Sequence, residues 1–263
     1  MLRQLLFLLG LLIYIPQMRS QKLYFCTPPV NNTSNVKIGV LDIETCDTTI
    51  LVETSISQLT FHSNGNLYGV KADSIFQVSL IDGALTFFGS FNLNGSVSSP
   101  GIAAINNTLF VIFYDPYNLG KFNVISGETS IVDPSWSGLT TPQGPTGLSV
   151  LNGKLISSNL LGGIYALDTT SLINNQLIFD HPVFDPLSNG LATIPVSCDS
   201  SRTFITNAFY PATSELEDIF EVNFQTQTLE HVCALDFRIN ALFTLEESLP
   251  PPCAITLDAD ADN

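Results

Sequence analysis

The chain has 263 residues, of which 24 are acidic and nine are basic, and its formal net charge is −15 at pH 7. Because only 13% of the residues are charged and 45% are hydrophobic, the composition excludes a solvated, disordered acidic protein. It also excludes nucleic acid as a partner, since a polyanion would be repelled and no cluster of Lys and Arg exists to neutralise phosphates.

Residues 1–20 have the form of a secretory signal peptide. Arg3 supplies the positive charge, an apolar run extends from Leu5 to Ile15, and Ser20 is a small residue at the expected cleavage point. The apolar run is too short to cross ~30 Å of hydrocarbon comfortably, although an uncleaved anchor is the alternative. No other segment approaches transmembrane length, so we expect a secreted or cell-surface protein with no membrane span after cleavage.

Export to an oxidising compartment makes disulfides the default state of the five cysteines, none of which forms a CxxC motif. The pairs that are close in the sequence, Cys26 with Cys46 and Cys198 with Cys233, are the local candidates. Five cysteines leave one over, and Cys253 is the natural odd one because it follows the repeats described next.

Internal repetition is the most informative feature of the chain. A short segment of the form Asn-Gly-x-Leu-aromatic, clearest at 64–68, recurs with anchor residues separated by 44, 42, 46 and 49 residues. The anchors are Leu23, Leu67, Leu109, Leu155 and Phe204. A period of about 45 residues is the size of one β-propeller blade.

Each anchor lies in the second of four predicted strands. In the clearest repeat an apolar strand at 58–61 precedes the anchor, and an Asn-Gly turn joins the two. An alternating strand at 75–80 follows, and after a turn comes a last strand at 85–88. Each repeat is therefore predicted to be a four-stranded antiparallel meander. No stretch has convincing helical periodicity.

The two chain ends are predicted to close a ring. The first repeat lacks the strand that should precede its anchor, whereas a segment resembling 56–61 follows the last repeat at 238–245. We therefore expect an all-β propeller of five blades, in which a C-terminal strand completes the N-terminal blade and removes exposed sheet edges. The predicted blades are 236–246 with 22–54, 55–92, 93–135, 136–182 and 183–235. A β-sandwich, an open solenoid and a six-bladed ring are the alternatives.

The stretches LTFHSNGNLYGV and IFQVSLIDGALT of the second blade resemble uncharacterised propeller-type repeats in large exported bacterial surface proteins, in the neighbourhood of NHL and YVTN propellers. The resemblance covers about residues 22–246, and the propeller-like domain is predicted to span 21–247. The resemblance implies a propeller architecture and indicates almost nothing about activity. Signatures of WD40, aspartate-box and kelch blades are absent.

The C-terminal segment 248–263 combines a triple-proline linker with an acidic tail. It resembles the start of a further adhesion-like module in such surface proteins, so we expect a piece of a longer protein or a truncated gene model. Asp258, Asp260 and Asp262 have the alternating spacing of a calcium loop, which makes calcium the one candidate cofactor. The downstream acid and glycine of an EF-hand are missing, and a solvated tail is the alternative.

The predicted inner strands carry no acid–base chemistry. Hydrolytic propellers of the lactonase type place acids and asparagines in the central channel, but 56–61, 101–105, 146–150, 191–196 and 239–245 contain no Asp, Glu or His. Their polar groups include Ser57, Gln58, Thr146, Thr193 and Asn240. No GxSxG elbow, HExxH helix, P-loop or dinucleotide fingerprint is present.

The titratable residues outside the inner strands do not form a recognisable set. His62, His181 and His231 occupy dissimilar repeat positions, and His62, beside a hairpin turn, is predicted to be solvated. Three aspartates follow third strands and are predicted to cap turns: Asp42, Asp82 and Asp168.

The favoured function is a secreted or surface-displayed, non-catalytic binding or adhesion module that contacts a protein or glycan through one loop face. Tyr117, Phe209 and Tyr210 lie in predicted loops, and their rings are candidates for stacking on sugars or protein surfaces, or for packing inside the domain. A propeller hydrolase or lyase with an atypical loop-face site and a purely structural spacer are the alternatives. We expect a monomeric domain.

Overall fold

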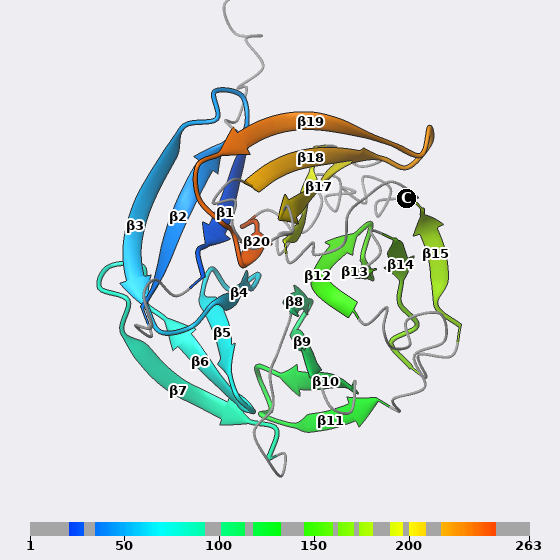
Figure 1. Cartoon of the computed structure of the whole chain (residues 1–263). Helices are drawn as coiled ribbons and strands as arrows, with labels where there is room; N and C mark the ends of the chain where they lie inside the picture. Colours follow the sequence, from blue (N-terminus) through cyan, green and yellow to red (C-terminus); the bar gives the residue numbers. More distant parts are fainter. Residues whose placement is uncertain are drawn as a thin grey trace, which may run out of the picture.

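The structure is a computed structural model, and it describes residues 21–28, 35–92, 101–113, 118–132, 145–159, 163–170, 174–180, 190–196, 200–208 and 217–245. Within these ranges, 20 β-strands form five four-stranded antiparallel sheets arranged around one axis (Figure 1). No helix long and apolar enough to cross a membrane is present in this part of the chain. The predicted five-bladed propeller is confirmed.

Each blade is one sheet, named here from its innermost strand outward. Blade 1 contains β20 (Ala241–Phe243), β1 (Lys22–Cys26), β2 (Val36–Asp42) and β3 (Thr48–Thr54). Blade 2 contains β4 (Gln58–Phe61), β5 (Leu67–Lys71), β6 (Ser74–Val78) and β7 (Leu85–Ser90). Blade 3 contains β8 (Gly101–Ile105), β9 (Thr108–Phe113), β10 (Asn118–Asn123) and β11 (Thr129–Val132). Blade 4 contains β12 (Pro145–Leu151), β13 (Lys154–Asn159), β14 (Ile164–Ala166) and β15 (Gln176–Phe179). Blade 5 contains β16 (Leu191–Pro195), β17 (Ser201–Ala208), β18 (Glu217–Asn223) and β19 (Thr228–Leu235).

The hydrophobic core is divided into clusters that lie between neighbouring blades. The repeat anchors are buried there, and none of the five is more than 3% exposed. One cluster, for example, combines Leu23 of blade 1 with Phe204 of blade 5. Because both faces of every blade are covered by a neighbour, the strands need few charged residues. Burying each of these large apolar side chains contributes roughly 1.5–3 kcal/mol to the stability of the fold.

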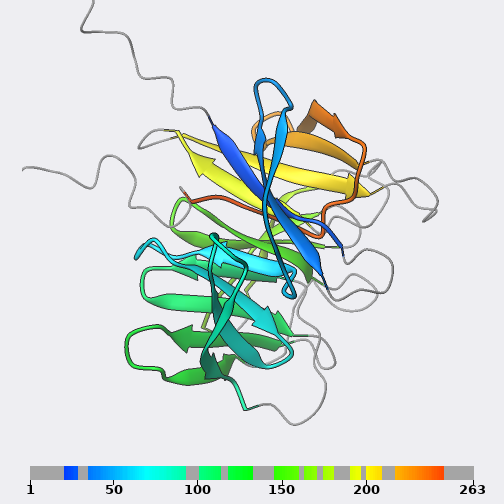
Figure 2. The same ribbon diagram turned by 90° about the vertical axis from the view of Figure 1, so that its left-hand side faces the viewer.

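The ring closes as predicted, with strands from the two chain ends in one sheet. The C-terminal strand β20 pairs with β1 through the registers Tyr24↔Phe243 and Cys26↔Ala241. Figures 1 and 2 both show the blue strands of blade 1 beside the orange strands of blade 5.

A disulfide between Cys46 and Cys233 joins the β2–β3 turn of blade 1 to the outer strand of blade 5, across a sequence separation of 187 residues. The local pairings expected from the sequence are therefore wrong, because ring closure brings together residues that are far apart in the chain. Cys26 is free and buried, and burial raises the pKa of its thiol, so it behaves as a small apolar residue. Cys198 and Cys253 lie outside the described residues.

The turn between the third and fourth strands is built alike in four blades. Its first residue accepts a hydrogen bond from the backbone N–H two residues on, through the side chain of Asp42, Ser79, Asn123 or Asn223. Its fifth residue has positive φ in every case: Cys46, Gly83, Gly127 and Gln227. The three aspartates predicted to cap turns all accept a backbone N–H two residues on.

Most of the outer edge strands contain a β-bulge. In blade 2, Phe76 pairs with Phe87 and Ile75 pairs with Gly89, so that Phe88 is an extra residue. Equivalent extra residues occur in blades 1, 4 and 5: Leu51, Ile178 and Val232. A bulge disrupts the regular row of backbone donors and acceptors, which hinders pairing with another chain. The β11 edge has continuous register but spans only Thr129–Val132.

Candidate functional site

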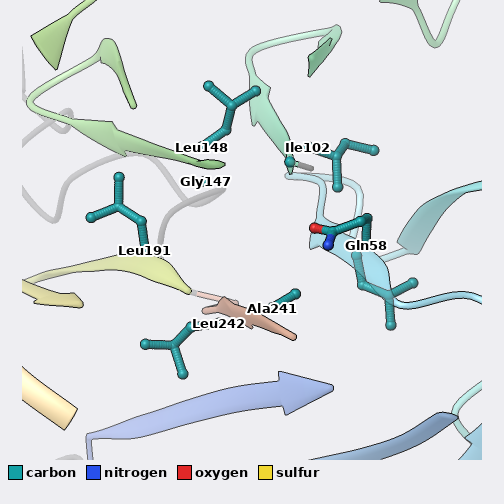
Figure 3. Close-up of a pocket in the computed structure, with 9 residues that line it drawn as sticks. Gln58, Ile102, Gly147, Leu148, Leu191, Ala241 and Leu242 are labelled. Carbon is teal, nitrogen blue, oxygen red and sulfur yellow. The ribbon is translucent and has the colours of Figure 1, made fainter. Parts of the chain in front are cut away.

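The central axis is where propellers offer a channel, and five inner strands surround it here. These are β4, β8, β12, β16 and β20, close to the predicted positions. A cavity of about 10 Å³ lies between these strands near their starts, and its lining includes Gln58, Gly101, Gly147, Leu191 and Ala241. Figure 3 shows that the Gln58 amide points into the space between the inner strands, while the other labelled side chains are aliphatic. Such a volume holds about one water molecule.

Glycine explains part of this narrowness. A Cβ atom added to Gly101 would lie 2.9 Å from the backbone nitrogen of Leu148, so β8 and β12 approach more closely than a side chain would permit. The axis between the described inner strands is therefore narrowed by closely approaching backbone, while Ile102, Leu148, Leu191 and Leu242 pack between the blades. The cavity of about 10 Å³ has no room for a molecule much larger than water.

The polar residues of the inner strands are used inside the protein. Gln58 donates to the carbonyl oxygen of Asn240 at 3.2 Å, and Thr146 lies 3.1 Å from the Ser158 hydroxyl. Thr193 accepts a hydrogen bond from Ser149 at 3.0 Å. These contacts tie neighbouring strands together. Among the described residues, no group of three or more His, Cys, Asp or Glu side chains is placed to hold a metal ion.

His62 is buried, with 2% of its surface exposed, so the prediction that it is solvated is wrong. Within the β4–β5 turn, Nδ1 of His62 accepts the backbone N–H of Asn64 at 3.1 Å, and the imidazole packs edge-on against Tyr68. With Nδ1 as an acceptor, the neutral ring carries its proton on Nε2, which has no partner among the described residues.

The three histidines do not come together as a metal triad would require. His231 is on the surface, 3.0 Å from the carboxylate of Asp218, whereas His62 is buried beside the β4–β5 turn. His181 lies outside the described residues.

Glu217 is the buried acid that sequence reasoning missed. It opens β18 with only 2% of its surface exposed, and its Oε2 atom accepts the backbone N–H of Ile239. Burial raises the pKa of the Glu217 carboxyl to about 7, against the opposing effects of the Ile239 N–H, the Thr206 hydroxyl and the charge of Arg238. Alternation was an available signal, because Glu217 shares a face with the buried Ile219.

Several predicted site residues lie outside the described residues. These are the aromatic candidates Tyr117, Phe209 and Tyr210, the calcium candidates Asp258, Asp260 and Asp262, and the signal segment 1–20. The strands β9 and β17, after which the aromatic candidates follow, are both second strands of their blades. Because every blade repeats the same antiparallel order, second strands end on the face of the ring where the inner strands begin. We call this face the entry face.

Comparisons with known proteins support the fold without indicating an activity. A scan against protein-family models found no match, and a search of curated proteins found none. A structure of a protein of unknown function from Bacteroides thetaiotaomicron VPI-5482 is similar, with a TM-score of 0.56 and 14% identity over 88% of this chain and 66% of that one. The chain thus spans slightly less than two thirds of that structure.

Two further structures have similar scores. A chain of a nidogen/laminin complex has a TM-score of 0.53 and 14% identity, covering 87% of this chain and 99% of that one. TolB from Acinetobacter baumannii has a TM-score of 0.50 and 12% identity, covering 87% and 57% respectively. At this level of identity the likeness shows the β-propeller fold alone.

Proposed function

We propose that this chain is a secreted or surface-displayed, non-catalytic binding module that contacts a protein or glycan through one face of its ring. The observation that carries the proposal is the narrow axis between the described inner strands. The cavity there has room for about one water molecule and none for a substrate, and the inner strands that line it carry no acid, base or histidine. A partner would therefore be met on the outside of the ring.

The entry face is the candidate binding face. It receives the connections after the second strands and after the outer strands, and the longest of these span 91–100, 133–144 and 180–190. Loops on a rigid scaffold are common locations for binding residues. Apart from the connection 167–175 between β14 and β15, the opposite face carries short turns, such as the hairpin between β8 and β9.

The kind of partner follows from charge and side-chain chemistry. A net charge of −15 disfavours polyanions, whereas aromatic rings such as those of Tyr117, Phe209 and Tyr210 stack on neutral sugars and on apolar protein surfaces. Their place in the connections after β9 and β17 supports a shared role on the entry face.

A binding assay with matched variants tests the proposal. The purified chain is applied to an array of neutral glycans and to immobilised cell-surface proteins. We expect a triple variant, Tyr117→Ala with Phe209→Ala and Tyr210→Ala, to lose at least tenfold in affinity. A control variant, Ile81→Ala with Phe87→Ala, changes two exposed residues outside the entry face and should bind normally.

Two results would contradict the proposal. Saturable turnover of an ester or lactone that disappears in the triple variant would indicate an enzyme. Equal binding by the triple variant and the wild type would exclude these rings as the contact. Export is tested separately, by sequencing the N-terminus of the protein recovered outside the cell, which we expect to begin at Gln21.

A further inference from the structure

Glu217 connects the last complete blade to the segment that closes the ring. Its carboxylate lies at the start of β18, and its Oε2 atom accepts the N–H of Ile239. Ile239 lies in the connection between β19 and β20, two residues before β20 begins. One buried acid is therefore bonded to the backbone that leads into the closing strand.

The closing strand has few backbone hydrogen bonds, and its three side chains are held by packing in the core clusters between blade 1 and its two neighbours. β20 has only three residues, each paired with β1. The adjoining Asn240 donates its N–H to the Cys26 carbonyl at 2.6 Å and accepts from Gln58 through its own carbonyl. The disulfide at Cys233 lies upstream in β19, so it restrains β19 directly and leaves β20 free to detach.

We propose that Glu217 is a pH-sensitive latch on this closing strand: the neutral carboxyl holds residues 239–243 in place, and ionisation loosens them while the other blades stay folded.

The physical basis is the cost of an ionised carboxylate in this position. Of its two oxygens, Oε1 has no hydrogen-bond partner among the described residues, so an ionised Glu217 would bury a charge that is satisfied on one side only. The surrounding groups do not remove the cost. Arg238 of the same connection and the hydroxyl of Thr206 in β17 favour the ionised form, whereas Asp218 of β18 opposes it. On β19, the residue opposite Glu217 is Leu235, which is apolar.

The direction of the effect follows from proton binding. Burial is the largest cause of the raised pKa of Glu217, about 7 in the closed ring, and opening returns the carboxyl to water and to its ordinary value of 4.5. Between these two values the closed form binds more protons than the open form. The stabilisation of the closed form is therefore complete below pH 4.5 and is lost as the pH rises through about 7.

Amide hydrogen exchange of the full chain measures the opening of β20 directly. After correction for intrinsic exchange rates, we expect the opening equilibrium of the amides of 241–243 to increase roughly 50- to 100-fold between pH 5 and pH 8. Amides in β9 and β13 should show little change. In Glu217→Gln the opening equilibrium should be independent of pH. Glu230→Gln, the same substitution at an exposed position on neighbouring β19, should keep the wild-type dependence.

A second measurement keeps the inference testable if Glu217→Gln does not fold. The carboxyl carbon of Glu217 in the wild-type protein can be followed by NMR, and we expect it to titrate near neutral pH, together with the exchange of β20. A titration midpoint near 4.5 would overturn the latch. So would a Glu217→Gln variant with wild-type pH dependence, or an opening that involves β9 and β13 equally.

Discussion

The repeated turn between the third and fourth strands shows how one backbone requirement is met by different residues. Its fifth position has φ between 56° and 73° in four blades, and it is occupied by Cys46, Gly83, Gly127 and Gln227. Glycine adopts this conformation without strain, whereas other residues are disfavoured by roughly 1–2 kcal/mol. Cys46 stands at the turn position where blades 2 and 3 have glycine, and its side chain forms the disulfide with Cys233.

Two glycines of this turn separate backbone strain from steric contact. Gly127 has open space around it, so Gly127→Ala should cost only the strain of positive φ, about 1 kcal/mol. A Cβ atom at Gly83 would lie 1.8 Å from the carbonyl oxygen of Glu53 in blade 1, so Gly83→Ala should cost about 2–4 kcal/mol. Urea unfolding of both variants and the wild type measures the difference. Equal costs would show that the contact between Gly83 and blade 1 does not restrict this turn.

Residue-scale errors of sequence analysis have a common origin. The turn after β4 was recognisable from its Asn-Gly pair, but the burial of His62 depends on how that turn packs against Tyr68. The burial of Glu217 likewise depends on the connection that contains Ile239. A local pattern identifies the element a residue belongs to, whereas burial at an element's end is decided by parts of the chain far away in sequence.

The outer strands show how an edge can be left uncharged and still be protected. The residue before the bulge is exposed in blades 1, 2 and 4, with Phe87 61% exposed. The bulge residue is half-buried in blades 2 and 4, whereas Leu51, the bulge residue of blade 1, is 41% exposed. Phe88 packs against Tyr68 and Phe122, with ring centroids 5.0 and 5.7 Å away. Two adjacent phenylalanines in one strand therefore have different roles, and strict alternation alone does not assign them.

This difference gives a matched test on β7. Phe88→Ser removes ring contacts between blades 2 and 3 and should lower the free energy of unfolding by about 1–3 kcal/mol. Phe87→Ser replaces an exposed ring and should change it by no more than about 0.5 kcal/mol. Thermal unfolding followed by circular dichroism compares the two. If Phe87→Ser were the more harmful, the inward direction of the bulge would be wrong.

The number and order of the strands were largely predictable, because period-two alternation and tight-turn residues recur about every 45 residues and indicate four strands per repeat. The inner strands were placed to within a few residues, as the overlap of predicted 101–105 with β8 shows. Bulges were not predictable in this way, since one extra residue shifts the alternation without any special composition. Cysteine pairing failed for a different reason, because proximity in sequence says little about a closed ring.

At the scale of the molecule, closure is secured at two distances from the axis. Near the axis, β20 completes the sheet of blade 1. Further out, Cys46 in a turn of blade 1 is bonded to Cys233 in the outermost strand of blade 5. Arg202 of blade 5 adds a third connection, because it donates to Gln21, which precedes β1, at 2.5 Å. Its guanidinium is held in place by a bidentate pair with Glu221 of the same blade. The interface between blades 5 and 1 is the seam at which an opened ring would separate.

The disulfide should therefore contribute mainly by restricting the unfolded chain. It closes a loop across 187 residues, and a double variant, Cys46→Ala with Cys233→Ala, should lose about 3–5 kcal/mol of stability. We expect the variant to fold, because β20 and the core between blades 5 and 1 remain. Denaturant unfolding of the oxidised proteins, with the intact fold checked by circular dichroism, measures the loss.

A second double variant distinguishes the cross-link from the strain at position 46. In Cys46→Gly with Cys233→Ala the turn receives the residue that blades 2 and 3 use at this position, so it should be about 1 kcal/mol more stable than the alanine pair. Both variants should remain below the wild type. If either variant matched the wild type, β20 and side-chain packing alone would hold the seam between blades 5 and 1. Ionisation of Glu217 would then open more of this seam than the strand β20.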